Sequence, residues 1–412
     1  MSTTKKDAYA AIRIPDFRML LGMRLMTTLC TQIMSVSVGY YIYELTENPM
    51  MLGFIGLTEA LPAIGISLWA GHMADKYNRR NLLVACISLL LLCSISLFTV
   101  ASLSDSISQS TLLFSIYSII FFTGIARGFF SPLNFAFLPQ LVDKERLQNA
   151  ITWNSSTWEV ASITGLGVGG LVYGFAGVEA TFGLMSVLCV AGLLFVLQIT
   201  PRPVPEGNLK EPAIKRIQEG LRFAFGSQLI ISAIALDLFA VFFGGAVALL
   251  PVFAKDILHV GPEGAGILRA GMSIGAITMA LFLAHKPLGK SAGKIMLACV
   301  AGFGLCIIGF GLSTNFYLSF VILVVAGMFD EVSVFIRAAL IQFQTPDRMK
   351  GRVSSVNSIF ITSSNELGAF ESGITAGLMG TVPAVVFGGL MTLAVVGFTW
   401  WKAPKLKNYD FE

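Results

Sequence analysis

The sequence predicts an all-α protein that crosses a membrane with twelve helices. Twelve long apolar runs fill most of the 412 residues, of which 55% are hydrophobic and 13% charged. The mean hydropathy is +0.76, and the lysines and arginines gather in alternate gaps between the runs. Because about 20 apolar residues span the hydrocarbon core as a helix, each run is long enough for one crossing. The composition excludes a soluble globular protein.

The charge pattern of the gaps predicts which side of the membrane each gap occupies. The predicted spans lie near residues 17–44, 50–74, 81–103, 111–140, 148–175, 178–199, 225–253, 263–284, 294–313, 316–343, 352–379 and 382–401. The termini and the even-numbered gaps are basic, whereas the odd-numbered gaps contain a single cation, Lys255. Cytoplasmic loops carry the excess of lysine and arginine. We therefore expect both termini to be cytoplasmic.

The longest polar stretch, 200–227, separates two sets of six spans. Its pattern predicts an amphipathic helix, which we expect to rest on the membrane surface. The expected organisation is a cytoplasmic N-terminal segment (1–16), a six-helix bundle (17–199), a cytoplasmic linker (200–224), a second six-helix bundle (225–401) and a cytoplasmic tail (402–412).

The two halves repeat each other. A shift of 203 residues aligns six positions without gaps: Gly124 with Gly327, Asn154 with Asn357, Gly165 with Gly368, Gly170 with Gly373, Gly174 with Gly377 and Gly177 with Gly380. A shift of 210 aligns Gly56 with Gly266 and Gly65 with Gly275. Since each half has six spans, both copies start on the same membrane face. We expect two parallel bundles related by a pseudo-twofold axis along the membrane normal.

The gap between spans two and three contains a motif, Gly71-His72-Met73-Ala74-Asp75-Lys76-Tyr77-Asn78-Arg79-Arg80. It resembles the loop signature of the major facilitator superfamily, with asparagine where that signature has a turn glycine. Asparagine also tolerates left-handed backbone, so we expect the turn to persist. The resemblance implies a conformational latch, formed by Gly71, Asp75, Lys76, Arg79 and Arg80, in which the aspartate pairs with an arginine. A merely basic cytoplasmic loop is the alternative.

Span five contains a glycine run that resembles the superfamily's fifth-helix motif of exporters, with Leu166 in place of its proline. Spaced glycines also let helices pack closely, and a plain packing role is the alternative. The predicted helix-packing glycines are Gly165, Gly169, Gly170, Gly373 and Gly377. The gaps at 138–150 and 345–353, with the segment 219–225, resemble a subgroup that includes the enterobactin exporter and relatives called transmembrane secretion effectors or multidrug efflux permeases.

Ionisable residues inside the spans are candidates for function, because each charge at mid-depth costs about 2.5–3.5 kcal/mol on insertion scales. The candidates for proton coupling or intramembrane ion pairs are Glu59, Arg127, Arg269, Asp330, Arg337, Glu366, Glu371 and Glu159. The repeat suggests the pairs Glu59–Arg127 and Arg269–Asp330. Arg337, seven residues after Asp330 on the same helix face, is the alternative partner. Permanent structural pairs are the other interpretation.

Two further groups of residues complete the predicted site. Arg24 and Asp237 lie early in spans one and seven and are gate candidates. Aromatic rings offer stacking and cation–π surfaces to an amphiphilic solute, although contact with lipid is commoner for them. The candidates for the substrate path are Tyr40, Phe129, Trp153, Trp158, Asn154 and Asn357.

The sequence contains no phosphate-binding loop, no HExxH, no paired-cysteine metal site and no nucleophile elbow. We therefore expect no enzyme activity, no cofactor, no bound metal and no nucleic-acid partner. The six cysteines lie inside spans and are expected to pack as small apolar residues. The expected function is that of a monomeric secondary transporter of the bacterial inner membrane, exporting a small amphiphilic or aromatic molecule such as a siderophore or a drug in exchange for protons. Symport of a nutrient, lipid transfer between leaflets, and a receptor that transports nothing are the alternatives.

Overall fold

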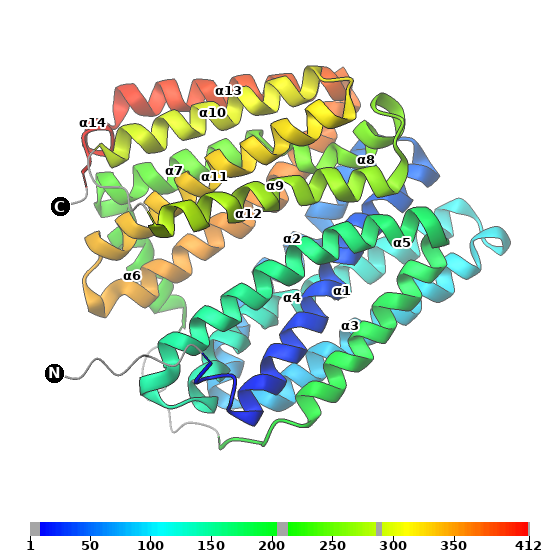
Figure 1. The fold of residues 1–412 in the computed structure, drawn as a ribbon, viewed down its shortest axis with the longest axis horizontal. Helices are drawn as coiled ribbons and strands as arrows, with labels where there is room; N and C mark the ends of the chain where they lie inside the picture. Colours follow the sequence, from blue (N-terminus) through cyan, green and yellow to red (C-terminus); the bar gives the residue numbers. More distant parts are fainter. Residues whose placement is uncertain (1–8, 204–212, 286–290, 411–412) are drawn as a thin grey trace. The chain divides into compact units, whose positions relative to one another are not determined.

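The computed structural model describes residues 9–203, 213–285 and 291–410, and this part of the chain is helical throughout, with no β-strand (Figure 1). The long helices are α1 (Pro15–Thr46), α2 (Pro49–Lys76), α3 (Arg79–Ser102), α4 (Gln109–Leu141), α5 (Leu147–Leu197), α6 (Ala213–Gly226), α7 (Gln228–Phe243), α9 (Gly261–His285), α10 (Ala292–Leu312), α11 (Phe316–Gln344), α12 (Asp347–Met379) and α13 (Thr381–Lys402). The short pieces are η1 (Ser104–Ser106), η2 (Lys144–Arg146), η3 (Ala246–Leu249), α8 (Leu250–Val252), η4 (Phe253–Ile257) and α14 (Pro404–Lys407).

The described helices supply the twelve crossings that the apolar runs predict. Ten stretches are long and apolar enough to cross a membrane. One of them provides two crossings, because α5 breaks at Gly177, whose φ of 85° and ψ of 174° are accessible to glycine but strained for other residues. The break falls between the predicted fifth and sixth spans. The remaining crossing is α12, which has 33 residues and a more polar sequence.

The chain forms two compact units. The first unit consists of residues 1–35 and 61–210, and the second of residues 36–60 and 211–412. The division falls inside α1 and α2. The end of α1 and the beginning of α2 therefore pack with helices from the second half of the sequence.

Within each unit, the repeated glycines make the same kind of helix contact. In the first unit, a Cβ built on Gly165 of α5 would lie 2.8 Å from the Cβ of Gln32 on α1. In the second unit, a Cβ built on its repeat partner Gly368 of α12 would lie 2.8 Å from the carbonyl oxygen of Phe242 on α7. The sequence repeat thus corresponds to a repeated close approach of two helices.

The predicted packing glycines of α5 and α12 lie at such contacts. A Cβ built on Gly169 would lie 3.0 Å from the Cα of Ile33, and Gly170 is buried. In the second unit, Gly373 lies against the backbone of Gly53, and a Cβ built on Gly377 would lie 3.1 Å from the side chain of Met50; Gly53 and Met50 both belong to α2. The second pair holds the beginning of α2 against α12.

Apolar clusters fill the interior of each unit. The first unit is built around Phe17, Leu83 and Phe137, each fully buried. The six cysteines are free thiols; four are buried and two are partly buried, in agreement with a packing role.

The linker helix and the C-terminal tail both pack on the second unit. Glu219 of α6 forms an ion pair with Arg352 of α12, and Gly220 approaches the Arg352 carbonyl. The expected contact of the linker helix with the membrane surface also involves side chains at 213–217, which lie outside the described residues. At the other end of the chain, the backbone N–H of Gly293 donates to the Tyr409 carbonyl at 3.0 Å, so the tail caps the beginning of α10.

Candidate functional site

A buried ion pair joins α7 and α11 in the second unit. Asp237 is 5% exposed and Arg337 is 3% exposed. The Nη1 atom of Arg337 lies 3.1 Å from Oδ2 of Asp237, and it also donates to Oδ1 of Asn357 on α12 at 3.1 Å. Removing one partner of a pair so enclosed leaves an uncompensated charge in the interior. The pair therefore fixes α7, α11 and α12 to one another.

A second acid lies beside this pair. Asp237 and Asp330 line the same small cavity, together with Ser333 and the apolar side chains of α10. Asp330, Ser333 and Arg337 follow one another on one face of α11, at spacings of three and four residues. The charged groups that act on Asp330 are Asp237 and Arg337. The cluster thus contains two carboxyl groups and one guanidinium.

The sequence predicts Asp237 as a gate residue early in a span, but the structure places it elsewhere. Its cavity neighbour Asp330 lies near the middle of α11, so Asp237 belongs to a cluster at mid-length of the helices. The ion-pair partner of Arg337 is Asp237, whereas in the sequence Arg337 is an alternative to Arg269 as the partner of Asp330. The other gate candidate, Arg24 of α1, lies in the first unit, and its buried Nε atom has no hydrogen-bond partner among the described residues.

The remaining charged candidates do not line the cavity. Glu59, Arg127, Arg269 and Glu366 are partly buried, and each takes part in an interaction. Glu371 accepts a hydrogen bond from Thr375 at 2.9 Å, one turn further along α12. Glu159 is partly buried on α5.

The arginines of the predicted latch bind the ends of helices within the first unit. Arg79 donates to the carbonyls of Ala74 and Ala136, at 2.9 and 2.7 Å. Arg80 donates to those of Val196 and Leu197, at 3.2 and 2.6 Å. Carbonyls in the last turn of a helix lack intrahelical donors and carry partial negative charge. The two guanidinium groups therefore hold the ends of α2 and α5, and the C-terminal part of α4, beside the start of α3.

The other residues of the latch motif differ in what the structure describes. Lys76 is exposed, with its Nζ 5.6 Å from the ring centroid of Tyr77. The side chain of Asp75 and the surroundings of Gly71 lie outside the described residues. Asn78 has φ −63° and ψ 117°, which is extended backbone and not the left-handed turn expected from the motif. Its side chain instead accepts a hydrogen bond from Asn81 N–H and caps α3, a position where asparagine is favoured.

The aromatic candidates separate into packing residues and exposed residues. Phe129 and Trp153 pack against the apolar cluster of the first unit, and the Trp153 ring lies 5.7 Å from that of Tyr9. Tyr40 is buried at 6% exposure, whereas Trp158 is 43% exposed. Of the two polar candidates, Asn357 accepts a hydrogen bond from Arg337.

Asn154, the repeat partner of Asn357, has a different environment in the first unit. Its buried Oδ1 atom has no hydrogen-bond partner among the described residues. Buried polar atoms are nearly always paired. Among the predicted substrate-path residues, Asn154 is therefore the one with an unused acceptor.

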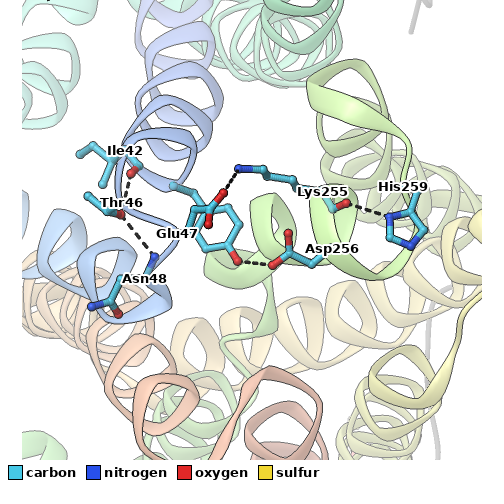
Figure 2. Close-up of polar contacts among 8 residues, drawn as sticks. Ile42, Thr46, Glu47, Asn48, Lys255, Asp256 and His259 are labelled. Carbon is cyan, nitrogen blue, oxygen red and sulfur yellow. Dashed lines mark hydrogen bonds and ion pairs between the residues drawn. The ribbon is translucent and has the colours of Figure 1, made fainter.

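A polar network that the sequence analysis does not identify joins the end of α1 to η4 in the second unit (Figure 2). The hydroxyl of Tyr43 donates to the Asp256 carboxylate. The Lys255 Nζ atom lies 3.0 Å from Oε1 of Glu47 and 5.6 Å from the ring centroid of Tyr43. A signal was present in the sequence, because Lys255 is the single cation of the odd-numbered gaps. Its partners on α1 lie more than 200 residues away and share no motif with it.

Local backbone geometry orients this network. Residues 253–257 form one turn of π-helix, a local widening that often lies at functional sites. It presents both Lys255 and Asp256 to α1. On the other side, Glu47 has a φ of 48° and ends α1, while the Asn48 side chain accepts from Met50 N–H at 3.0 Å at the start of α2. The network thus holds the tight turn between α1 and α2 against η4.

Replacing Tyr43 with phenylalanine is expected to loosen this turn more than replacing Glu47 with glutamine. Tyr43 is 3% exposed and donates to a charged acceptor, a bond that contributes about 1.5–3 kcal/mol. The Glu47 side chain is 75% exposed, and exposed pairs contribute about 0–1 kcal/mol. Hydrogen–deuterium exchange of residues 42–50 in the purified protein should rise about 10- to 100-fold in Tyr43→Phe and little in Glu47→Gln. Equal exchange in the two variants would contradict this ranking.

No group of three or more histidine, cysteine, aspartate or glutamate residues suited to a metal ion occurs in the part of the chain that the structure describes. The site offers ion pairs, carboxyl groups and unpaired buried oxygens. These groups bind charged and hydrogen-bonding species.

Known proteins resemble this chain in both sequence and fold. The family described as transmembrane secretion effector matches residues 6–412. The enterobactin exporter EntS of Shigella boydii serotype 4 is 26% identical over 386 residues, which cover 92% of this chain and 90% of the relative. EntS of Escherichia coli O1:K1 matches with the same identity and coverage.

Several solved transporters have a similar fold. A variant of the nucleoside transporter NupG has a TM-score of 0.71 at 13% identity, covering 94% of this chain and 99% of its own. A bacterial homologue of the human lysosomal transporter Spinster has a TM-score of 0.71 at 14% identity, covering 97% of both chains. The xylose transporter XylE of E. coli has a TM-score of 0.68 at 12% identity, covering 97% of this chain and 96% of its own. At these identities the likeness concerns the fold alone.

Proposed function

Because the chain belongs to the transmembrane secretion effector family of the major facilitator superfamily, we propose that it is a proton-coupled exporter of a small amphiphilic or aromatic molecule, such as a siderophore or a drug. The observation that carries the proposal is the match over residues 6–412, together with similarity along 92% of the chain to proteins named as enterobactin exporters. Transport proceeds by alternating access between two six-helix bundles, 17–199 and 225–401. The protein acts as a monomer in a bacterial inner membrane.

Two features of the second unit support a transport cycle. The cluster of Asp237, Asp330 and Arg337 supplies charges whose pairing can change with protonation. The hydrogen bond between Tyr43 and Asp256 is an interaction that can form in one conformation and break in another. In the first unit, the exposed ring of Trp158 and the unused acceptor of Asn154 support a path for an amphiphilic solute.

The basic gaps support an orientation with both termini in the cytoplasm. In that orientation Arg79 and Arg80 lie on the cytoplasmic side, where they bind carbonyls of α2, α4 and α5, and Asp75 is the changeable part of the latch that we propose. The turn between α1 and α2 lies on the opposite side.

Accumulation assays in a bacterial host lacking its own efflux pumps test the function. Cells that produce the protein should retain less of a siderophore or an amphiphilic dye than cells with an empty vector. An uncoupler that dissipates the proton gradient should abolish the difference, because export against a concentration gradient then has no energy source. Greater retention in the producing cells would indicate symport instead. Equal retention for every compound tried, with the protein present in the membrane, would contradict export.

A further inference from the structure

The cavity between α7, α10 and α11 has an unusual lining for the interior of a helical unit. Two carboxyl groups, from Asp237 and Asp330, and one hydroxyl, from Ser333, line it together with apolar groups. α10 contributes Val300 and Phe303 and no charge. The cavity therefore presents oxygen atoms to a species enclosed on its other sides by hydrocarbon.

The charges around the cavity do not balance when both carboxyl groups are ionised. Arg337 supplies one positive charge, and its Nη1 atom is engaged by Asp237 and by the neutral amide of Asn357. No hydrogen bond or ion pair joins Asp330 to another described residue. Arg269 lies on α9, which packs against α11, and it does not line the cavity. Two negative groups and one positive group leave a net charge of −1, which is unfavourable in the interior of a protein.

An independent observation points to a ligand. Ser333 is 2% exposed, and its Oγ atom has no hydrogen-bond partner among the described residues, although it lines the cavity. Serine hydroxyls in helices commonly bond to the preceding turn or to a neighbour. The unpaired hydroxyl and the two carboxyl groups beside it together offer oxygen ligands to a positively charged species.

We propose that this cavity binds one monovalent cation, held by the carboxylates of Asp237 and Asp330 and by the hydroxyl of Ser333. The inference rests on the proposed function, because it gives the coupling ion a site. Oxygen ligands suit hard cations, and one positive charge neutralises the cluster whereas two would reverse its sign. A sodium ion and a proton on Asp330 both meet these requirements.

Equilibrium binding to the purified full-length protein in detergent tests the site without any transported molecule. One arm measures ²²Na⁺ binding at mildly alkaline pH, with N-methyl-D-glucamine as the replacement cation. The other arm measures protons taken up when the pH is lowered to mildly acidic values. We expect about one ²²Na⁺ per chain or, in the absence of sodium binding, about one proton per chain more than in the Asp330→Asn variant.

Matched variants assign the binding to the cavity. Asp330→Asn and Asp237→Asn should weaken sodium binding at least tenfold or remove the extra proton. Ser333→Ala keeps all three charged groups and should fold normally, so it decides the matter if the aspartate variants do not fold; it should weaken sodium binding severalfold or shift the midpoint of proton uptake. The controls are Ser319→Ala, a buried serine of α11 that bonds to Ser313, and Asp105→Asn, an exposed acid of η1. Both should match the wild type.

The outcomes separate this inference from the proposed function. Wild-type protein that binds neither sodium nor an extra proton relative to Asp330→Asn overturns the site, as does binding that is unchanged in Ser333→Ala and in both aspartate variants. Cation binding at the cavity in a protein that exports nothing contradicts the export proposal and leaves the site in place.

Discussion

Arg337→Gln is expected to destabilise the protein by about 3–5 kcal/mol, the range for removal of one partner from a buried ion pair. Arg337 is 3% exposed and is the guanidinium that compensates Asp237, with Asp330 on the same cavity. Its loss leaves the buried carboxyl group of Asp237 and the partly buried one of Asp330 without that charge. The variant should reach the membrane in smaller amounts and unfold at a lower temperature in detergent.

Substitution of the other member of the ion pair provides the control. Asp237→Asn should be milder than Arg337→Gln, because the remaining guanidinium still lies beside Asp330 and Asn357. The double variant should be more stable than Arg337→Gln alone, since it removes the stranded charge together with its partner. A double variant less stable than the single arginine variant, or a single variant as stable as wild type, would show that the pair does not carry this energy.

Gly275→Leu is expected to prevent the second unit from folding. A Cβ at Gly275 of α9 would collide with the Val324 carbonyl of α11, and one at Gly327 of α11 would collide with the Met272 carbonyl of α9. Overpacking against side chains costs about 1–3 kcal/mol, but here the obstacle is the backbone of a packed helix, which cannot rotate away. The amount of folded protein, measured by gel filtration in detergent, should fall below detection.

Gly397→Leu is the matched control, because a Cβ at Gly397 of α13 meets no atom within 4 Å. It introduces the same side chain into a helix of the same unit and should leave the elution profile unchanged. Folded Gly275→Leu in normal amounts would mean that α9 and α11 can separate without loss of the unit.

The fold could be predicted closely because lipid imposes a simple constraint on sequence. Length and apolarity define each crossing, and they placed a boundary between spans five and six where Gly177 breaks α5. The spacing of repeated glycines likewise anticipated the contacts of Gly165 and Gly368. These features are local or periodic, so a single chain displays them.

The partners of the charged residues could not be predicted in the same way. Arg337 has Asp330 seven residues earlier, but its ion-pair partner is Asp237, on a helix one hundred residues away. The choice depends on how α7 is rotated, which hydropathy does not encode. Asn78 was interpreted from its place in a motif, yet its side chain caps a helix from extended backbone. The motif specifies residue types and leaves the backbone angles open.

The division of the chain within α1 and α2 has a consequence for how the two halves of the gene product depend on each other. Residues 36–60 are encoded in the first half but fold into the second unit, where Gly53 and Tyr43 contact α12 and η4. Proteolysis in the linker would therefore not release two self-sufficient pieces. The carboxyl-terminal fragment would lack residues 36–60, which complete its interior. The amino-terminal fragment would carry these residues without the helices that they pack against.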